Sequence, residues 1–125
     1  MGKKGDIVGL ECNMRPCGGN TIDLYNLASS VSVYEIYADI IVFGKNNQNM
    51  NEEKYYAIAS SKRDGLSYKN SVDDVKLEYS GNIFLEGTYP KGYSDAMGDS
   101  YIYARFKNLD TALSFDKKIR EKNRN

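Results

Sequence analysis

Histidine and tryptophan are absent from this 125-residue sequence, and cysteine occurs only twice. Without histidine, no Ser-His-Asp or Cys-His catalytic pair can form within the chain. A zinc site with histidine ligands is excluded for the same reason, and Cys12 and Cys17 are too few for a structural site that needs four nitrogen or sulfur ligands. The phosphate-binding patterns Gly-x-x-x-x-Gly-Lys-Ser/Thr and Gly-x-Gly-x-x-Gly are also missing. These absences predict a protein that is not an enzyme and that holds no metal or cofactor.

The sequence also lacks any apolar run close to the roughly 20 residues that a membrane-spanning helix needs. The N-terminus begins with basic residues, but Asp6 and Glu11 interrupt the stretch that follows, unlike a signal peptide. Asp6 also stands where the myristoylation pattern has Ser or Thr. We therefore expect a cytoplasmic protein without membrane association.

The composition is that of a globular domain, with 41% hydrophobic and 27% charged residues. The net charge is zero, although residues 101–125 carry +4 and the rest of the chain carries −4. Overall neutrality disfavours a general binder of polyanions and leaves room for a local basic patch. Since no repeat or proline-rich linker divides the sequence, residues 1–125 are expected to form a single domain.

Apolar residues that alternate with polar ones predict an antiparallel sheet of about five to six strands. The clearest run is residues 33–43, which is followed by a polar loop over 44–53. Gly81-Asn82 is a two-residue hairpin signal between two later runs. The segments expected to be extended are 6–12, 21–27, 33–43, 54–61, 75–79, 83–88 and 100–107.

The last element is predicted to be a helix. Asn108 is a good N-cap, Asp110 suits the positive end of the helix dipole, and the basic residues over 117–122 suit the negative end. The apolar residues share one side of the helical wheel: Leu109, Ala112, Leu113, Phe115 and Ile119. The predicted fold class is α+β, an antiparallel sheet with one C-terminal amphipathic helix packed on one face and the other face open.

Two local clusters are weak candidates for chemistry. Glu35 and Asp39 would lie about 13 Å apart on a strand that rises ~3.3 Å per residue, which is wider than the ~5–9.5 Å between glycosidase carboxylates. Four residues separate Cys12 from Cys17, whereas thioredoxin-type chemistry needs two. We expect solvent-facing carboxylates and two reduced thiols near a turn, with a local disulfide as the alternative.

The face of the last strand that lies opposite the expected helix carries Tyr101, Tyr103, Arg105 and Lys107. Exposed aromatic rings beside cations stack bases in single-stranded nucleic-acid binders. Residues 99–106 resemble the central strand motif of the RNA recognition domain at three aromatic positions. They depart from it where the motif has a basic residue, a first glycine and a small residue. The resemblance implies nucleic-acid binding on this face.

The loop over 88–101 is rich in tyrosine, glycine, serine and aspartate. Tyrosine supplies a large contact area with little loss of entropy, and the small polar residues supply adaptable hydrogen bonds, as in antibody-like paratopes. Asp95 and Asp99 lack the dense oxygen ligands of a calcium loop, so no metal is expected here. The loop therefore favours contact with a macromolecule, with a plain surface crossover as the alternative.

The sequence as a whole favours a small non-enzymatic protein that binds a protein partner. A compact chain of this composition without catalytic equipment is typical of the inhibitors of host complexes that phages and mobile elements encode. Single-stranded nucleic-acid binding and small-ligand binding are the alternatives, and open strand edges favour a homodimer. The predicted partner-binding residues are Tyr89, Lys91, Tyr93, Asp95, Tyr101, Tyr103, Arg105 and Lys107.

Overall fold

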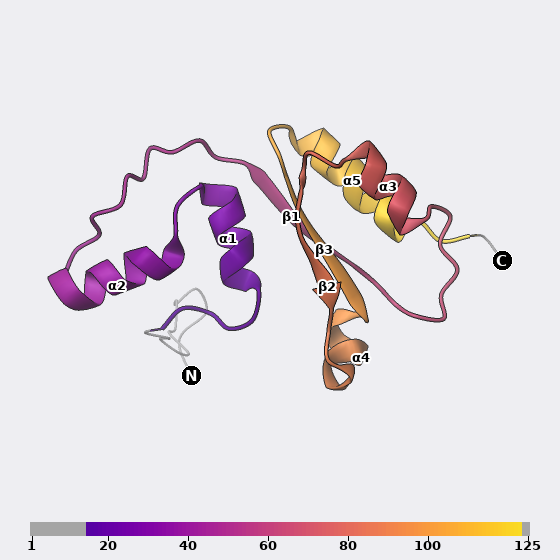
Figure 1. The fold of residues 1–125 in the computed structure, drawn as a ribbon, viewed down its shortest axis with the longest axis horizontal. Coiled ribbons are helices and arrows are strands. Elements are labelled where there is room, and N and C mark those ends of the chain that lie inside the picture. Colours follow the sequence, from indigo (N-terminus) through magenta and orange to yellow (C-terminus); the bar gives the residue numbers. More distant parts are fainter. Residues whose placement is uncertain (1–14, 124–125) are drawn as a thin grey trace, which may run out of the picture.

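A computed structural model of the chain describes residues 15–123 and places helices on both sides of a small sheet (Figure 1). The elements in chain order are α1 (Thr21–Ser29), α2 (Val33–Phe43), β1 (Tyr56–Lys62), α3 (Val72–Glu78), β2 (Ile83–Thr88), the 3-10 turn η1 (Lys91–Tyr93), α4 (Ser94–Met97), β3 (Ser100–Phe106) and α5 (Leu109–Arg120). The α+β class is confirmed, and no helix within 15–123 is both long and apolar enough to cross a bilayer.

Within residues 15–123 the sheet has three strands in the order β1-β3-β2, and both outer strands run antiparallel to β3. In the register, Ile58 of β1 and Ile83 of β2 both lie opposite Ala104 of β3. The antiparallel pairing is therefore confirmed, and the predicted number of five to six strands is wrong. The observed strands coincide closely with three of the predicted extended segments, and the remaining described segments are helical.

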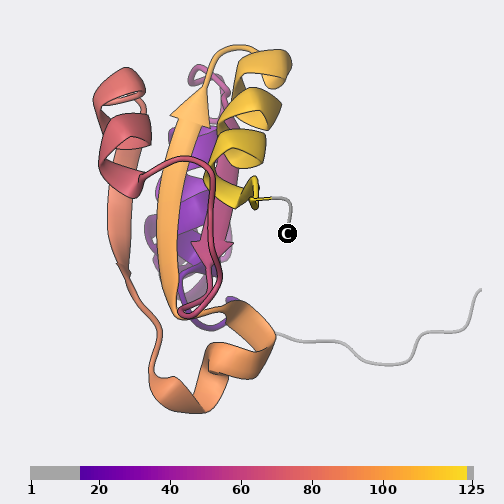
Figure 2. The same cartoon turned by 90° about the vertical axis from the view of Figure 1, so that its right-hand side faces the viewer.

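Helices cover both faces of this sheet, so the expectation of one helix and an open face is wrong (Figure 2). α5 packs on one face beside α3, and α1 packs on the other face against β1 and β3. The core lies between α5 and the sheet, and its buried residues are Val75, Ile102, Ala104, Phe106, Ala112, Phe115 and Ile119. The inward face predicted for the last strand is therefore confirmed.

The start of α5 follows the capping signal in the sequence. The side chain of Asn108 accepts a hydrogen bond from the N–H of Thr111 at 3.1 Å. Along the buried side of the helix, the ring of Phe115 lies 5.4 Å from the ring of Tyr79, which also meets Phe106 edge-on at 5.9 Å. Such edge-to-face pairs add to the apolar burial that fixes α5 and α3 together.

Residues 33–43 form helix α2 and not the predicted strand. The hydroxyl of Ser32 accepts a hydrogen bond from the N–H of Glu35 at 3.2 Å, and Gly44 follows the helix with a φ of 68°. These are the start and stop signals of a helix. Because almost every residue of the segment is apolar, its alternation fits a helix as well as a strand. Glu35 and Asp39 therefore lie one helical turn apart, and the separation expected for a strand does not apply.

Two further segments that were expected to be extended are helical. Residues 21–27 belong to α1, and residues 75–78 belong to α3, which begins where the Ser71 hydroxyl accepts a hydrogen bond from the Asp74 N–H at 3.0 Å. The predicted hairpin at Gly81-Asn82 is therefore absent. Asn82 instead binds β3, because its carbonyl accepts from the N–H of Arg105 and its amide donates to the Arg105 carbonyl, each at 2.9 Å.

The predictions for the N-terminal segment are only partly covered by the structure. The strand expected over 6–12 lies outside the described residues, as does Cys12. Cys17 is exposed. The pairing of the two thiols therefore stays a prediction.

Candidate functional site

Tyrosine side chains from two parts of the chain line a pocket of about 480 Å³ beside the N-terminus of α1. Tyr101 and Tyr103 come from β3, whereas Tyr89 and Tyr93 come from the segment between β2 and α4. The other residues that line this tyrosine pocket are Gly18, Gly19, Asn20, Thr21, Thr88, Pro90 and Met97. Four of the eight residues predicted from the sequence therefore meet at one site.

The rings of the pocket form a contiguous row. Tyr101 and Tyr103 point to the same side of β3 because they are two residues apart on a strand, and their ring centroids are 5.3 Å apart. Tyr89 joins the row at 4.7 Å from Tyr101. The N–H of Tyr89 donates to the carbonyl of Asp99 at 2.8 Å, which extends the β2–β3 pairing by one bond. The row is therefore built on the sheet and not on a loop alone.

A glycine on the neighbouring strand accommodates the Tyr101 ring. Gly87 of β2 lies opposite Tyr101, and a Cβ atom at this position would be only 2.6 Å from the Tyr101 hydroxyl oxygen. Any larger residue would therefore push the ring out of its place. This contact fixes the ring across β2, where it closes one wall of the pocket.

Tyr103 lies at the back of the pocket and is only 4% exposed. The predicted outward orientation of this side chain is wrong, because α1 packs on this face of the sheet and covers it. Burial raises the pKa of the Tyr103 hydroxyl well above its ordinary value, and a hydrogen bond with the Tyr89 side chain raises it further. The hydroxyl is therefore neutral throughout the physiological pH range.

Hydrogen bonds from the end of β1 hold the segment that carries Tyr93. The guanidinium of Arg63 donates to the carbonyls of Ser94 and Asp95 at 3.0 and 2.7 Å. The carboxylate of Asp99 accepts from the N–H of Asp64 at 2.8 Å. Hydrogen bonds from Ser94 and then from Asp64 hold the pKa of Asp99 below its ordinary value. Asp99 is thus an ionised anchor of the pocket wall.

Lys91 and Asp95, two more of the predicted residues, have exposed side chains and do not line the tyrosine pocket. They lie on η1 and α4, next to the residues that do. No group of three or more metal-ligating side chains occurs within residues 15–123. These two charged residues therefore contribute to the rim of the site.

Arg105 and Lys107 form a separate cluster. The guanidinium of Arg105 lies 4.3 Å from the ring centroid of Tyr55 and 4.5 Å from that of Phe84. The ammonium of Lys107 lies 2.8 Å from the carboxylate of Glu53, an exposed ion pair that raises the pKa of Lys107 and lowers that of Glu53. The four residues that the sequence predicted on one face of the last strand therefore belong to two sites: the tyrosines line the pocket, and Arg105 and Lys107 contact Tyr55, Phe84 and Glu53 instead.

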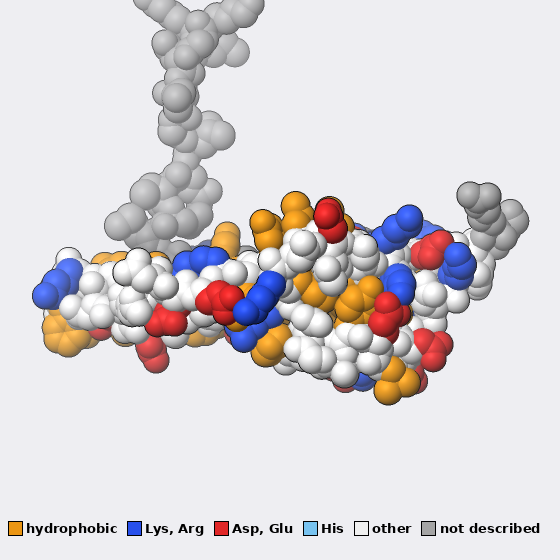
Figure 3. All heavy atoms as spheres, turned by 90° about the horizontal axis from the view of Figure 1, so that it is seen from above, with side chains coloured by type: hydrophobic (Ala, Val, Ile, Leu, Met, Phe, Trp, Pro, Cys, Tyr) orange, Lys and Arg blue, Asp and Glu red, His pale blue; other side chains and the backbone are white. Residues whose placement is uncertain are grey.

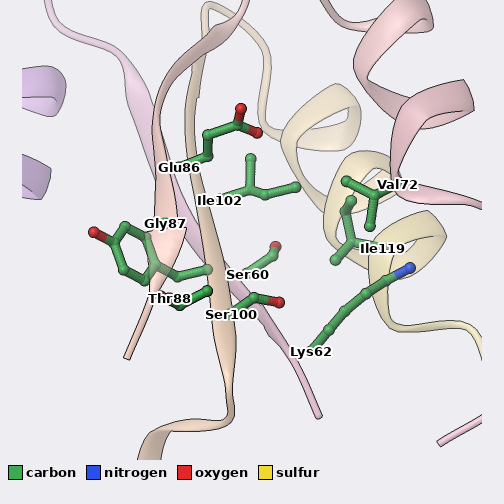
Figure 4. A pocket seen from close by; sticks show the side chains of 10 residues that line it. Ser60, Lys62, Val72, Glu86, Gly87, Thr88, Ser100, Ile102 and Ile119 are labelled. Atoms are coloured by element: carbon green, nitrogen blue, oxygen red, sulfur yellow. The ribbon is translucent and has the colours of Figure 1, made fainter. Parts of the chain in front are cut away.

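A second hollow, of about 390 Å³, lies on the other side of the sheet between α3, α5 and β2 (Figure 4). Lys62 and Glu86 line it, and Ser60 and Ser100 lie on its floor. The ammonium of Lys62 donates to the carbonyl of Asn70 at 3.1 Å, and burial lowers its pKa. Glu86 forms an ion pair with Lys76 of α3. The charged groups of Lys62 and Glu86 are therefore both bonded within the chain.

The largest departure from the sequence prediction is the surface of α2. None of its residues is buried, although nine of its eleven residues are apolar. Its most exposed apolar side chains, with relative exposures between 38% and 68%, are Tyr34, Tyr37, Ile40, Ile41, Val42 and Phe43. The Ser32-x-x-Glu35 cap and the glycine at position 44 are the sequence signals that could have identified this helix.

The few polar groups of α2 are acidic. Glu35 is exposed, and the carboxylate of Asp39 accepts hydrogen bonds from the N–H of Asn47 and the side-chain amide of Gln48, both at 3.0 Å. These bonds, with Gln48 first, hold the pKa of Asp39 below its ordinary value. The helix carries no lysine or arginine, so its surface is apolar with an acidic stripe.

Comparisons with known proteins return no match to a family model, a curated protein or a solved structure.

Proposed function

We propose that this chain is a small non-enzymatic protein that binds a protein partner, and that α2 is its main anchoring element. The observation that carries the proposal is an eleven-residue helix with nine apolar residues, none of which is buried. A helix that is apolar on nearly all sides is usually enclosed by protein. Among the helices and strands of the described chain, it contacts only the neighbouring helix α1 to any extent. A partner that covers α2 would remove this apolar surface from water.

The arrangement of the exposed side chains fits one mode of recognition. Tyr34, Tyr37 and Ile41 follow the i, i+3, i+7 spacing of a helix that inserts into an apolar groove. Their relative exposures are 54%, 38% and 67%, which leaves more than a third of each residue available for contact. Figure 3 shows one cluster of hydrophobic side chains at the tip of the molecule that carries α2, beside basic and uncharged side chains. Tyrosine is also the residue type most enriched at binding hot spots, together with tryptophan and arginine.

Charge narrows the chemistry of the partner. Glu35 and Asp39 are the only ionisable groups of α2 besides its tyrosines. A groove with an apolar floor and basic residues along one edge would complement this surface. The sequence also led to a more specific proposal, in which the partner is a host complex and this chain is its phage- or mobile-element-encoded inhibitor. That proposal stays a prediction.

Nucleic-acid binding draws less support from the geometry. Tyr103 is covered by α1, both rings that flank Arg105 are supplied by the chain itself, and Lys107 is paired with Glu53. A stacking platform needs exposed rings beside unpaired cations. Protein binding is therefore the function that we carry forward.

Affinity capture from a bacterial lysate, with and without nuclease, tests the proposal. We expect a defined protein that survives nuclease with the wild-type chain and is lost with the triple variant Tyr34→Ala, Tyr37→Ala, Ile41→Ala. The matched control is Leu109→Ala with Leu113→Ala, which removes exposed apolar side chains from α5. A photo-crosslinking amino acid in place of Ile41 should label the same protein. Capture of nucleic acid alone, or of the same protein by the triple variant, would contradict the proposal.

A further inference from the structure

We infer that the tyrosine pocket binds a proline-rich segment in the polyproline II conformation. The inference rests on the proposed function only in that the ligand belongs to a protein partner. It uses a surface other than α2, formed by the ends of β2 and β3 and the N-terminus of α1. The argument depends on the hydrogen-bonding groups, the spacing of the rings and the rigidity of this pocket.

The first part of the argument is the lack of charge. The residues that line the pocket include no Asp, Glu, Lys or Arg. A charged ligand would therefore lose its hydration without gaining an ionic partner. A phosphate or carboxylate group would find no cation, because the guanidinium of Arg63 is already directed at two backbone carbonyls. A cation would face the N-terminus of α1, where the helix dipole places partial positive charge. The pocket is suited to a neutral ligand.

The second part is the kind of hydrogen bond that the pocket offers. The hydroxyls of Tyr93, Thr21 and Thr88, which are exposed, can donate to a ligand in it, and the first N–H groups of a helix have no partner within the helix. A proline-rich chain has the opposite character, since proline keeps its carbonyl and has no N–H. In polyproline II the backbone makes no internal hydrogen bonds, so these carbonyls are free to accept. Donors in the pocket and acceptors in the ligand are complementary.

The third part is the spacing of the aromatic row. Tyr89 and Tyr101 are both partly exposed, and their ring centroids lie 4.7 Å apart, whereas Tyr103, at 5.3 Å from Tyr101, is buried and only supports the row from behind. One turn of polyproline II has three residues and covers roughly 9 Å. One proline of each turn can therefore rest against the accessible Tyr89–Tyr101 pair. Aromatic-lined grooves of this kind recognise proline-rich segments in several unrelated domains.

The fourth part is that the pocket exists before any ligand arrives. The Tyr101 ring lies against Gly87, Tyr103 is buried, and the segment with Tyr93 is held by hydrogen bonds from Arg63. Polyproline II is itself a preformed conformation. Binding would consequently order few groups on either side, which reduces its entropic cost.

The test is a titration of the full chain with an oligoproline peptide, followed by amide chemical shifts and calorimetry. We expect saturable binding and shifts confined to residues 18–21 and 88–103. Tyr93→Ala should weaken binding roughly tenfold or more, as for an aromatic hot spot. Tyr93 is 59% exposed, so this variant should keep its fold. Tyr56→Ala in β1, at a similar exposure of 48%, is the matched control and should bind like the wild type.

Three outcomes would overturn the inference. They are the absence of saturable binding, equal binding of a Gly-Ser peptide of the same length, and unchanged affinity in Tyr93→Ala. Shifts of the same amides with tetramethylammonium would reassign the pocket to a cationic ligand. Failure of oligoproline to bind would leave the lysate capture through α2 untouched. Failure of capture with retained oligoproline binding would contradict the α2 proposal alone.

Discussion

Helices α2 and α5 are nearly equal in length and differ sharply in how the fold uses them. α5 has five apolar residues among twelve, arranged as a stripe, and buries Ala112, Phe115 and Ile119. α2 has nine among eleven, distributed almost all round, and buries none. Burial in this protein therefore follows the arrangement of apolar residues and not their number. The one-sided apolar stripe of α5 packs on a sheet face. Helix α2 is apolar on almost every side and leaves most of this surface exposed, where another molecule can contact it.

The largest effect should come from the same substitution made in both helices. Phe115→Ala in α5 removes a ring with 0% exposure and should cost about 3–5 kcal/mol of unfolding free energy. Phe43→Ala in α2 removes a ring that is 61% exposed and should change that free energy by no more than about 0.5 kcal/mol. Urea denaturation of both variants measures the contrast. Equal losses would show that α2 belongs to the cooperative core.

Removal of the N-caps of α5 and α2 tests the same comparison, with a smaller expected change in unfolding free energy. Asn108→Ala removes the cap of α5 and should lower the global unfolding free energy by about 1 kcal/mol. Ser32→Ala removes the equivalent bond of α2. Because α2 contributes no buried residue, this variant should instead accelerate amide exchange over residues 33–37 and leave the global value unchanged. Hydrogen exchange resolved by residue separates the two outcomes.

The smallest effect concerns the pH dependence of the α3–α5 contact. The Lys118 ammonium lies 2.6 Å from a Glu78 carboxylate oxygen, which lowers the pKa of Glu78 and raises that of Lys118. The carboxylate contribution is present above the ordinary pKa of 4.5 and is lost as the pH falls below it. The ammonium contribution is present below 10.5 and is lost as the pH rises past it.

Glu78→Gln should therefore lower stability slightly at neutral pH and leave it unchanged in acid, where Glu78 of the wild type is protonated, so the acid limb of the stability profile becomes flatter. The difference should be small because the pair is exposed to solvent. Asp39→Asn is the matched change on α2, since hydrogen bonds from Gln48 and Asn47 lower the pKa of Asp39 too. It should alter only the loop that follows the helix. Denaturation curves collected from acid to neutral pH check both variants. If Glu78→Gln and the wild type lose stability equally between neutral and acid pH, the Glu78–Lys118 pair does not contribute to the pH dependence of stability.

The same comparison explains which parts of the fold could be predicted from the sequence. β3 and α5 were identified because only one period fits each: Ile102, Ala104 and Phe106 alternate, and Asn108 marks a helix start. α2 was misassigned because a segment that is apolar almost throughout satisfies both periods. In such a segment the capping residues Ser32 and Gly44 carry more information than the alternation does.

Because residues 21–27 were predicted to be extended and form α1 instead, the prediction of the site was also partly wrong. Tyr101 and Tyr103 were correctly placed on the side of β3 opposite α5, and four predicted tyrosines do meet in one pocket. The burial of Tyr103 could not be foreseen, because it depends on α1, which was expected to be extended. The partners of Arg105 and Lys107 depend on Tyr55 and Glu53, some fifty residues earlier in the chain, and no local pattern links them. Long-range pairings of this kind are what the sequence alone leaves open.

The strand order has a consequence for biosynthesis. Among residues 15–123, β3 is the last strand to be made and the central one in the sheet, so the pairings of β1 and β2 with it form only after it is made. After β1 is complete, 44 more residues must be added before β3 ends, which takes roughly 2–9 s at typical rates of translation. During that time the growing chain displays the edges of both strands that β3 will pair, together with the apolar α2. A chain that ends before residue 100 would lack the central strand, and with it every strand pairing of the described sheet.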